Sequence, residues 1–476
     1  MQRLTKFYNQ MITTIVTVFI LGYAAIALES SLKINKTAIA LLLCVLCWVL
    51  YMTDCNTFVI QMHGPELGKF MQETHLTDTL QATHAFITEH ILLTHLGDTC
   101  EIIFFLMGAM TIVETVDASG GFGFVKNKLS TRSKRALLWR IVFMTFFLSA
   151  ILDNLTTSIV MIMVLRKLIS NKEERLMYAC MVILAANSGG AFSPIGDVTT
   201  IMLWIKGNIT TQGVIQELLI PSLVSVIIPT LIVQTRLKGE LSVQPEETVT
   251  GSSNYLSQAQ KNTLFCIGVG GLIMVPVFRA FTGLPPFMGI LLVLSLLWVT
   301  SELFYRNINE EIDSTMKQRV SDLLHKIDLS TILFFLGILM AVASLQETGV
   351  LSSFGKWLDN VSGHNAYWVT GVIGVVSSIV DNVPLVASCM GMYNVVPATV
   401  TDPALLNFVQ DGIFWQLLAY CAGVGGSILI IGSAAGVVIM GLEKITFGWY
   451  LKNISWLAFV GYIAGIGTYW VEKLFM

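Results

Sequence analysis

The sequence predicts an all-α polytopic membrane protein with an inverted structural repeat, and three observations support this fold class. Of the 476 residues, 54% are hydrophobic and only 12% are charged, about half the charged fraction of soluble domains. The mean hydropathy is +0.72, and several long apolar runs follow one another. Motifs of the first half also recur in order in the second. Together these observations predict about ten membrane crossings, two re-entrant hairpins and two broken helices.

The first inverted repeat is expected to occupy residues 1–238. Its apolar runs predict single helices at about 11–29, 37–53, 101–116 and 214–235. Between the second and third of these lies a polar stretch, 54–97, which we interpret as a loop. A helix broken at NSGGAFSPIGD is expected over 177–206, because glycines and a proline interrupt an apolar run.

A re-entrant hairpin is predicted at 139–168. The apolar run 141–165 has Asp153 and Asn154 at its middle and basic clusters on both flanks. A single crossing would leave one cluster on the wrong side under the positive-inside rule, whereas a hairpin keeps both cytoplasmic. Each limb would then be about a dozen residues long, and an ionisable residue at the tip predicts a functional site.

A cytoplasmic linker over 239–261 precedes the second inverted repeat, 262–476. Helices are predicted at about 263–281, 287–304 and 329–345, with a charged, cytoplasmic interfacial helix within 305–328. The second hairpin is expected over 366–397 and the second broken helix over 413–445.

Three motif pairs support the duplication. Phe104-Phe105-Leu106 matches Phe334-Phe335-Leu336, and Asp153-Asn154 matches Asp381-Asn382. The glycines of NSGGAFSPIG match those of GVGGSILIIG, and the three offsets lie between 228 and 236 residues. The flanks of the second hairpin contain one Lys and no Arg, so this hairpin should face outward, opposite to the first. Opposed repeats whose broken helices meet at the midplane are typical of secondary transporters.

The two tips and the two breaks are expected to supply a cation and proton site. Carboxylates, amides, hydroxyls and freed carbonyls are hard oxygen donors that suit a small hard cation. A buried carboxylate near neutral pH holds either a proton or a metal ion, and this competition is enough for exchange. The candidate residues are Asp153, Asn154, Thr156, Thr157, Asn187, Asp197, Thr199, Thr200, Ser377, Asp381, Asn382, Gly425, Gly426 and Ser427.

The segments DNLTT, NSGGAFSPIGDVTT, DNVPL and GVGGSILIIGSAAGV resemble the motifs of the NhaD family of sodium/proton antiporters, within the ion transporter superfamily. The resemblance covers nearly the whole chain and implies exchange of Na+ (or Li+) for H+ without a cofactor. It also implies that the polar residues of these motifs take part in transport, here Asp153, Asn154, Asn187, Asp197, Thr199, Thr200, Ser377, Asn382 and Ser427.

The two halves differ at the site. Asp197 is matched by Ser433, and Thr199-Thr200 by Ala435-Gly436. We therefore expect one main Na+ site nearer the first half, formed by Asp153, Asn154, Asn187 and Asp197.

Other interpretations remain open. A Na+-coupled symporter of an anionic substrate is disfavoured because repeated carboxylates would repel an anion, and a passive cation channel because the halves are unequal and the hairpins opposed. Asp153 and Asp381 could instead cap helices, Asn187 could serve packing, and the hydroxyls of Thr199 and Thr200 could bond to their own helix. No nucleophile elbow, HExxH or phosphate loop occurs, so no enzyme activity is expected.

Five histidines, His63, His75, His84, His90 and His95, lie in the polar stretch 54–97. Their spacing matches no standard metal-ligand pattern, so a solvated loop is favoured over a metal site or a pH sensor. We expect the lipid bilayer, Na+, Li+ and H+ as partners, no nucleic acid, a homodimer, and a location in the bacterial inner (plasma) membrane.

Overall fold

The computed structural model describes residues 2–27, 29–121, 129, 131, 133–169, 171–237, 239–240, 256–306, 320–324, 328–379, 381–402 and 405–475. Their regular elements are all helices. Among them, eight helices are long and apolar enough to cross a membrane. The predicted fold class, an all-α polytopic membrane protein, is confirmed. By its contacts the chain forms two compact units, described separately below.

Unit 1 comprises residues within 1–103, 328–365 and 383–394. Helix α3 packs against α1 and α16, where Trp48 donates a hydrogen bond to the Met340 carbonyl oxygen at 2.9 Å. Gly337 permits this approach, since a Cβ there would lie 2.7 Å from the α3 backbone. The elements of unit 1 are α1 (Gln2–Ala27), α2 (Glu29–Leu32), α3 (Lys36–Thr53), α4 (Cys55–Thr74), α5 (Thr79–Phe86), a π-helical turn (Ile87–Ile91), the start of α6 (Leu92–Ala118), α16 (Leu329–Glu347), α17 (Val350–Val361) and all but the first residue of α19 (Asn382–Met392).

The prediction of a loop over 54–97 is wrong, because most of this stretch is helical. It forms α4, α5 and the π-helical turn, and α6 begins at Leu92, earlier than the predicted 101. The polar composition concealed these helices, and α4 is kinked at His63 and contains Pro65.

The expectation of solvated histidines is also wrong for His63 and His95. The Nε2 atoms of both lie 2.8 Å from the two carboxylate oxygens of Glu347, which is buried at the end of α16. Because a buried carboxylate needs partners, the histidines are held in the protein rather than in solvent. His63 Nδ1 also lies 2.6 Å from Glu66. Among the described residues, no group of three or more His, Cys, Asp or Glu side chains could hold a metal ion.

This cluster predicts a pH-dependent stability of unit 1. The hydrogen bond with Glu347 raises the pKa of His63 from 6.5 to about 9, despite partial burial, with Glu66 adding to the effect. A raised histidine pKa stabilises the fold fully below pH 6.5, and the stabilisation is lost as the pH rises through about 9. Thermal unfolding followed across this range should show the loss.

A His63→Gln variant should flatten this pH profile, whereas His84→Gln, at an exposed position on α5, should leave it unchanged. An unaltered profile in His63→Gln would show that the pairing with Glu347 does not control stability.

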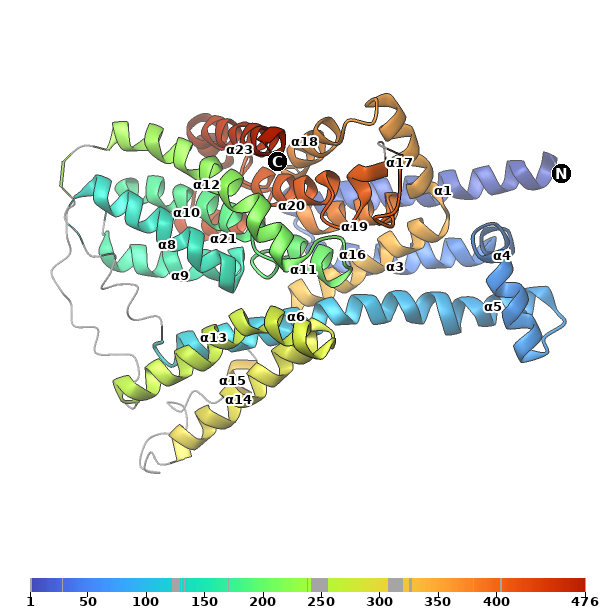
Figure 1. Cartoon of the computed structure of the whole chain (residues 1–476), viewed down its shortest axis with the longest axis horizontal. Helices are drawn as coiled ribbons and strands as arrows, with labels where there is room; N and C mark the ends of the chain where they lie inside the picture. Colours follow the sequence, from blue (N-terminus) through green and yellow to red (C-terminus); the bar gives the residue numbers. More distant parts are fainter. Residues whose placement is uncertain are drawn as a thin grey trace. The chain divides into compact units, whose positions relative to one another are not determined.

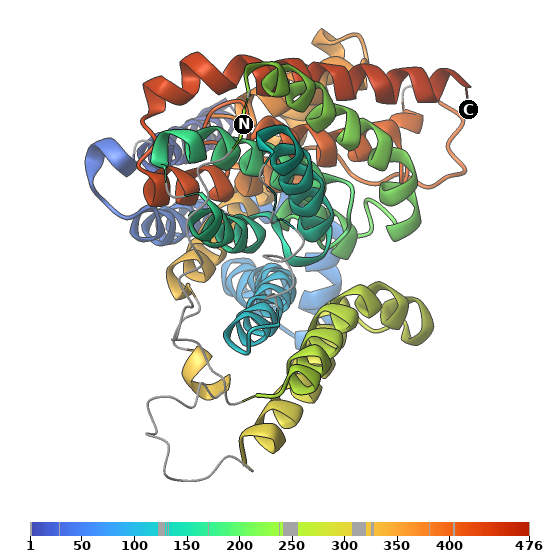
Figure 2. The same cartoon turned by 90° about the vertical axis from the view of Figure 1, so that its left-hand side faces the viewer.

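Unit 2 comprises residues within 104–327, 366–382 and 395–476. Figure 1 shows α8, α9, α10, α12, α20 and α23 as neighbours, and in the turned view of Figure 2 the red α23 lies along α12. Its elements are the end of α6, α8 (Lys134–Leu152), α9 (Asn154–Leu168), α10 (Lys172–Ala191), α11 (Val198–Ile205), α12 (Thr211–Arg236), α13 (Gln258–Thr282), α14 (Pro286–Arg306), α15 (Val320–Leu323), α18 (Ala366–Ser377), a 3-10 turn (Leu405–Phe408), α20 (Ile413–Gly425), α21 (Ala434–Glu443), α22 (Phe447–Tyr450), a π-helical turn (Leu451–Ser455) and α23 (Trp456–Phe475).

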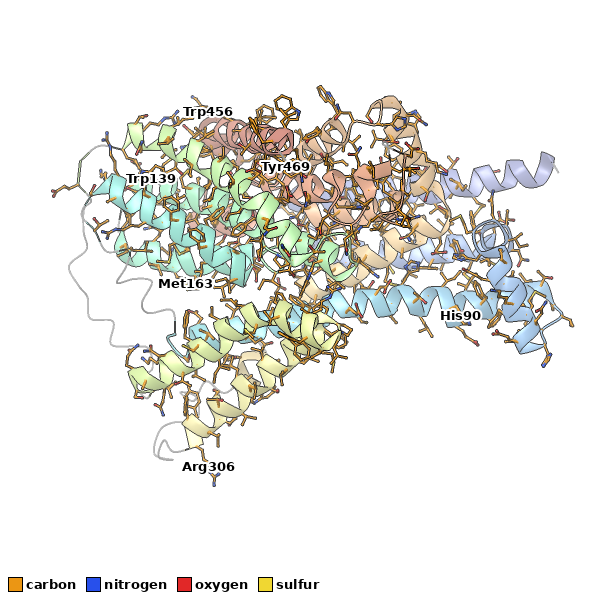
Figure 3. The ribbon with its side chains drawn as sticks, viewed as in Figure 1. His90, Trp139, Met163, Arg306, Trp456 and Tyr469 are labelled. Atoms are coloured by element: carbon orange, nitrogen blue, oxygen red, sulfur yellow. The ribbon has the colours of Figure 1, made fainter. Side chains whose placement is uncertain are left out.

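The first hairpin has unequal limbs. Helix α8 has 19 residues and α9 has 15, so the expected dozen per limb is too short for α8. The difference arises because Ser133 caps α8 and the basic residues Lys134 and Arg135 belong to the helix. Trp139 of α8, labelled in Figure 3, donates a hydrogen bond to Gln234 of α12 at 2.9 Å.

Two pairs of helices in unit 2 approach each other through glycine in the same way. A Cβ on Gly189 of α10 would lie 2.1 Å from the Phe146 carbonyl oxygen of α8, and one on Gly425 of α20 would lie 2.2 Å from that of Gly374 on α18. Beside these glycines, the Ser149 hydroxyl donates to the Ala186 carbonyl at 2.7 Å and the Ser377 hydroxyl to that of Ala422 at 2.9 Å.

Parts of two predictions lie outside the described residues. In the linker predicted over 239–261, these are residues 241–255, and in the stretch 305–328 they are 307–319 and 325–327. The helices predicted at 214–235, 263–281, 287–304 and 329–345 are confirmed as α12, α13, α14 and α16.

Candidate cation-binding site

The first broken helix presents Asp197 in the interior of unit 2. Helix α10 ends at Ala191 and α11 begins at Val198, with Asp197 as its N-cap. The Asp197 carboxylate accepts hydrogen bonds from the Thr199 backbone at 2.9 Å and the Thr199 hydroxyl at 3.0 Å. Asp197 is only 1% exposed, so its charge depends on these protein donors.

Asp153 forms the tip of the first hairpin, between α8 and α9. Its φ of 85° lies in the left-handed region, which a residue other than glycine seldom occupies. One carboxylate oxygen accepts from the Thr156 backbone and the other from the Thr156 hydroxyl, both at 2.8 Å. Asp153 therefore caps α9, as the structural alternative proposed, with both of its oxygens on Thr156.

Amides from both hairpin tips converge on Asp197. The Asn154 side-chain amide donates to one carboxylate oxygen of Asp197 at 2.7 Å, and that of Asn382 makes a longer contact of 3.4 Å to the other. The charge of Asp197 also interacts with those of Asp153 and Asp381. One carboxylate thus gathers polar groups from three separate segments of the sequence.

Asn187 joins this carboxylate to the second broken helix. Its side-chain oxygen accepts from Asn154 at 3.1 Å, and its amide donates to the hydroxyls of Ser427 and Ser433, each at 2.9 Å. Asn187 is fully buried, and its side chain forms these hydrogen bonds with other side chains. These bonds go beyond the packing role that was the alternative for this residue.

The remaining predicted residues serve other contacts. The Thr200 hydroxyl donates to the Asp197 carbonyl oxygen at 2.9 Å, so Thr200 bonds to its own helix. Ser377 and Gly425 belong to the α18–α20 contact, and a Cβ on Gly426 would lie 2.9 Å from the Gly432 carbonyl oxygen. Thr157 is fully buried, and its hydroxyl has no hydrogen-bond partner among the described residues.

Sequence reasoning missed a charged cluster at the end of α21. Glu443 is buried, and its carboxylate accepts from Arg166 Nε at 2.7 Å and from Arg175 Nε at 2.9 Å. Arg175 also donates to the Ile169 carbonyl at 2.7 Å. The sequence contains a signal for this cluster, because an acidic residue lies near the end of the second predicted broken helix and two arginines occur in and beside the first hairpin.

The hydrogen-bonded cluster of Asp197, Asn154, Asn187, Thr199, Asn382, Ser427 and Ser433 combines one buried carboxylate with amides and hydroxyls. These are the oxygen donors that a hard monovalent cation or a proton requires. Together with two helix breaks and a hairpin tip in a polytopic helical protein, the cluster defines the class of secondary ion transporters.

Comparison with known proteins is consistent with this class. Residues 23–410 match the family model described as "Citrate transporter". "Sodium/proton antiporter 1" and "Sodium/proton antiporter 2" of Arabidopsis thaliana are 43% and 40% identical to the chain, over 95% of its length and 71% and 97% of theirs. "Na(+)/H(+) antiporter NhaD" of Vibrio cholerae is 28% identical over 94% of the chain and 89% of its own length. The chain belongs to this transporter family, in its NhaD-type sodium/proton antiporter branch.

Proposed function

We propose that the chain exchanges Na+ (or Li+) for H+ across a membrane. The observation that carries this proposal is the buried Asp197 carboxylate, which is hydrogen-bonded to Thr199 and to the amides of Asn154 and Asn382 at the two hairpin tips. The names of the relatives support it. A negative charge on a buried carboxylate is costly, and binding of either a cation or a proton compensates it, so the two ions compete for the carboxylate.

In this proposal Asp197 supplies the charged oxygen, while Asn154, Asn187 and Thr199 supply neutral donors beside it. Asp153 and Asp381 contribute negative charge that favours a cation at the cluster. The same charges disfavour anion symport, despite the description of the family as citrate transporters, because a citrate carboxylate would be repelled. No cofactor enters the proposed cycle.

Everted membrane vesicles from a host without its own exchangers test the function. Addition of Na+ or Li+ should dissipate a preformed pH gradient in vesicles that contain the protein. Asp153→Asn should abolish this response, because it removes a negative charge beside the cluster. The variant should still fold, because the asparagine side-chain oxygen can cap α9 by accepting from Thr156. Exchange at the normal rate in this variant would remove Asp153 from the proposal.

We also propose that residues 1–238 and 262–476 are inverted repeats. The matched glycine contacts of Gly189 and Gly425, and the matched serine contacts of Ser149 and Ser377, support this division. In an inverted pair, the two hairpins enter the membrane from opposite sides.

Cysteines introduced at Ser133 and Thr401 test this orientation. Both positions are exposed. Ser133 precedes the first hairpin, and Thr401 follows the second. In a background without native cysteines, an impermeant thiol reagent should label Ser133→Cys only from the cytoplasmic face and Thr401→Cys only from the opposite face. Labelling of both from one side would exclude the inverted arrangement.

We further propose a homodimer in the bacterial inner membrane. Relatives of the chain occur both in a plant and in bacteria. Fractionation of the source cells identifies the membrane in which the protein resides. Light scattering of the detergent-solubilised protein measures the oligomeric state.

A further inference from the structure

Two junctions join the broken helices of unit 2 to each other at their ends. The first broken helix consists of α10 and α11 and the second of α20 and α21, and α20 packs against both α10 and α11 (Figure 1). At one junction Glu443, the last residue of α21, accepts a hydrogen bond from Arg175 in the first turn of α10. At the other, Asp411 just before α20 binds the loop that follows α11.

The Asp411 junction consists of four hydrogen bonds. The Asp411 carboxylate accepts from the Thr210 backbone at 2.7 Å and from the Thr210 hydroxyl at 2.6 Å. The Asp411 backbone donates to the Asn208 carbonyl oxygen at 3.0 Å. The Gln410 side-chain amide donates to the Gly207 carbonyl oxygen at 2.7 Å. Because these acceptors and donors lie between α11 and α12, the bonds fix the end of the first broken helix to the start of the second.

The backbone of Asp411 is held in an unfavourable conformation. Its φ of 59° lies in the left-handed region, which residues other than glycine seldom occupy. Such residues persist where the surrounding structure holds them, and they cluster at functional sites. Gly213 leaves room for the side chain, since a Cβ there would lie 2.3 Å from a carboxylate oxygen of Asp411. The four hydrogen bonds therefore hold Asp411 in a conformation that it would seldom adopt by itself.

The internal repeat relates the two junctions. The glycines Gly189 and Gly425 of the two helix breaks are 236 residues apart in the chain, and Arg175 and Asp411 are separated by the same number. Each of these two charged side chains binds the end of the other half's broken helix. The same arrangement therefore occurs twice, with a basic side chain in one half and an acidic one in the other, so the junction does not depend on one kind of ion pair.

The cation cluster depends on how the two broken helices are aligned. Asp197 is the N-cap of α11. The Asn187 amide of α10 donates to Ser427 and Ser433 in the second break, which requires the two breaks to lie side by side. Helix α11 has 8 residues and is about 12 Å long, so its far end lies only two turns from Asp197. A shift of the end of so short a helix shifts the carboxylate as well.

We propose that Asp411 is a positioning residue of the cation site, which holds α11 and the start of α20 in the alignment that the Asp197 cluster requires. This inference rests on the proposed Na+/H+ exchange. Asp411 acts through the helix ends that it joins, and not on the cation itself. Its loss should therefore weaken cation binding and leave the maximal rate of exchange largely unchanged.

Thr210→Val and Thr210→Ser test the junction. Valine has the shape of threonine but lacks the hydroxyl that donates to Asp411, whereas serine keeps it. Thr210→Val should raise the apparent KM for Na+ about 10-fold, since loss of a residue that supports a metal ligand costs 10–100-fold in affinity. Thr210→Ser should retain the KM of the unmodified protein. The measurement is dissipation of a pH gradient in everted vesicles over a wide range of Na+ concentration, with thermal unfolding measured beside it.

Thr446→Val is the matched control. The pair Ile445-Thr446 is the counterpart of Ile209-Thr210 at the same offset of 236 residues. Both threonines cap the helix that follows, Thr446 at α22 and Thr210 at α12, so valine removes a cap at either position. Only the bond to Asp411 distinguishes the two substitutions in this comparison, and Thr446→Val should leave the KM unchanged.

Gln410→Ala provides a milder second variant. Gln410 is exposed, and its truncation removes the bond to Gly207 without altering the cap of α12. The apparent KM for Na+ should rise about 3-fold, in the lower range for loss of one hydrogen bond.

Two results would overturn the positioning role. In the first, Thr210→Val and Thr446→Val change the KM for Na+ equally. In the second, Thr210→Val and Gln410→Ala leave the KM unchanged, whatever their effect on the unfolding temperature, and the junction then has only a structural role. Failure of the proposed exchange has a different signature, because the unmodified protein would then show no response to Na+ and both proposals would fall.

Discussion

Asp197→Ser is expected to raise the apparent KM for Na+ about 100-fold or more. Loss of a residue that only supports a metal ligand costs 10–100-fold in affinity, so loss of the charged ligand itself should cost at least as much. The carboxylate accepts from Asn154 and Thr199, and contacts Asn382, so its removal leaves these donors without their charged partner. The measurement is Na+-dependent dissipation of a pH gradient over a wide range of Na+ concentration.

Serine is chosen because it preserves the helix start. Ser433, which matches Asp197 in the second half, caps α21 with its hydroxyl, so serine at 197 can cap α11 in the same way. Ser433→Ala is the matched control: it removes one acceptor of Asn187 and a cap, and should change the apparent KM only mildly. Equal damage from both variants would favour two equivalent sites over a single site at Asp197.

Gly425→Ala and Gly189→Ala are expected to destabilise the protein by about 3 kcal/mol or more, the upper range for added volume in a packed interior. Each new methyl carbon would lie 2.1–2.2 Å from a backbone carbonyl oxygen of the facing helix. A backbone oxygen cannot move aside as a side chain can, so the helices must separate. Thermal unfolding in detergent should show a similar loss for both variants, because the two contacts match.

Gly441→Ala provides the control for these glycine variants. Gly441 lies on α21, and a Cβ there would meet nothing within 4 Å. Since alanine favours helix more than glycine does, this variant should be neutral or slightly stabilising. Unfolding temperatures near that of the unmodified protein in all three variants would contradict the close helix contacts.

The sequence was most informative where a local pattern determines structure. The motif NSGGAFSPIGD ends α10 and precedes α11, and Asp153 lies between two helices, as predicted. Glycine, proline and capping residues act on their own neighbourhood, so their effect can be read from the chain. The candidate residues Asn154, Asn187 and Asp197 were identified for the same reason, because polar groups are rare in apolar runs.

Pairings between distant residues could not be predicted in this way. His63 and Glu347 are separated by 284 residues, and nothing near either residue indicates the other. The helices of 54–97 were missed because their polar composition resembles that of a loop. The capping role of Asp153 does not follow from the sequence alone, because a carboxylate before a threonine is compatible with both a cap and a cation ligand.

The ion pairs of the buried Glu443 carboxylate with Arg166 and Arg175 restrict which parts of unit 2 can move during transport. They attach the end of α21 to α9 and to the start of α10, so elements of the two sequence halves are joined at one end. Separation would leave a buried carboxylate without partners, at a cost of several kcal/mol. A transport cycle that keeps these pairs must hold the end of α21 against α9 and the start of α10, so larger relative movements are confined to other parts of unit 2.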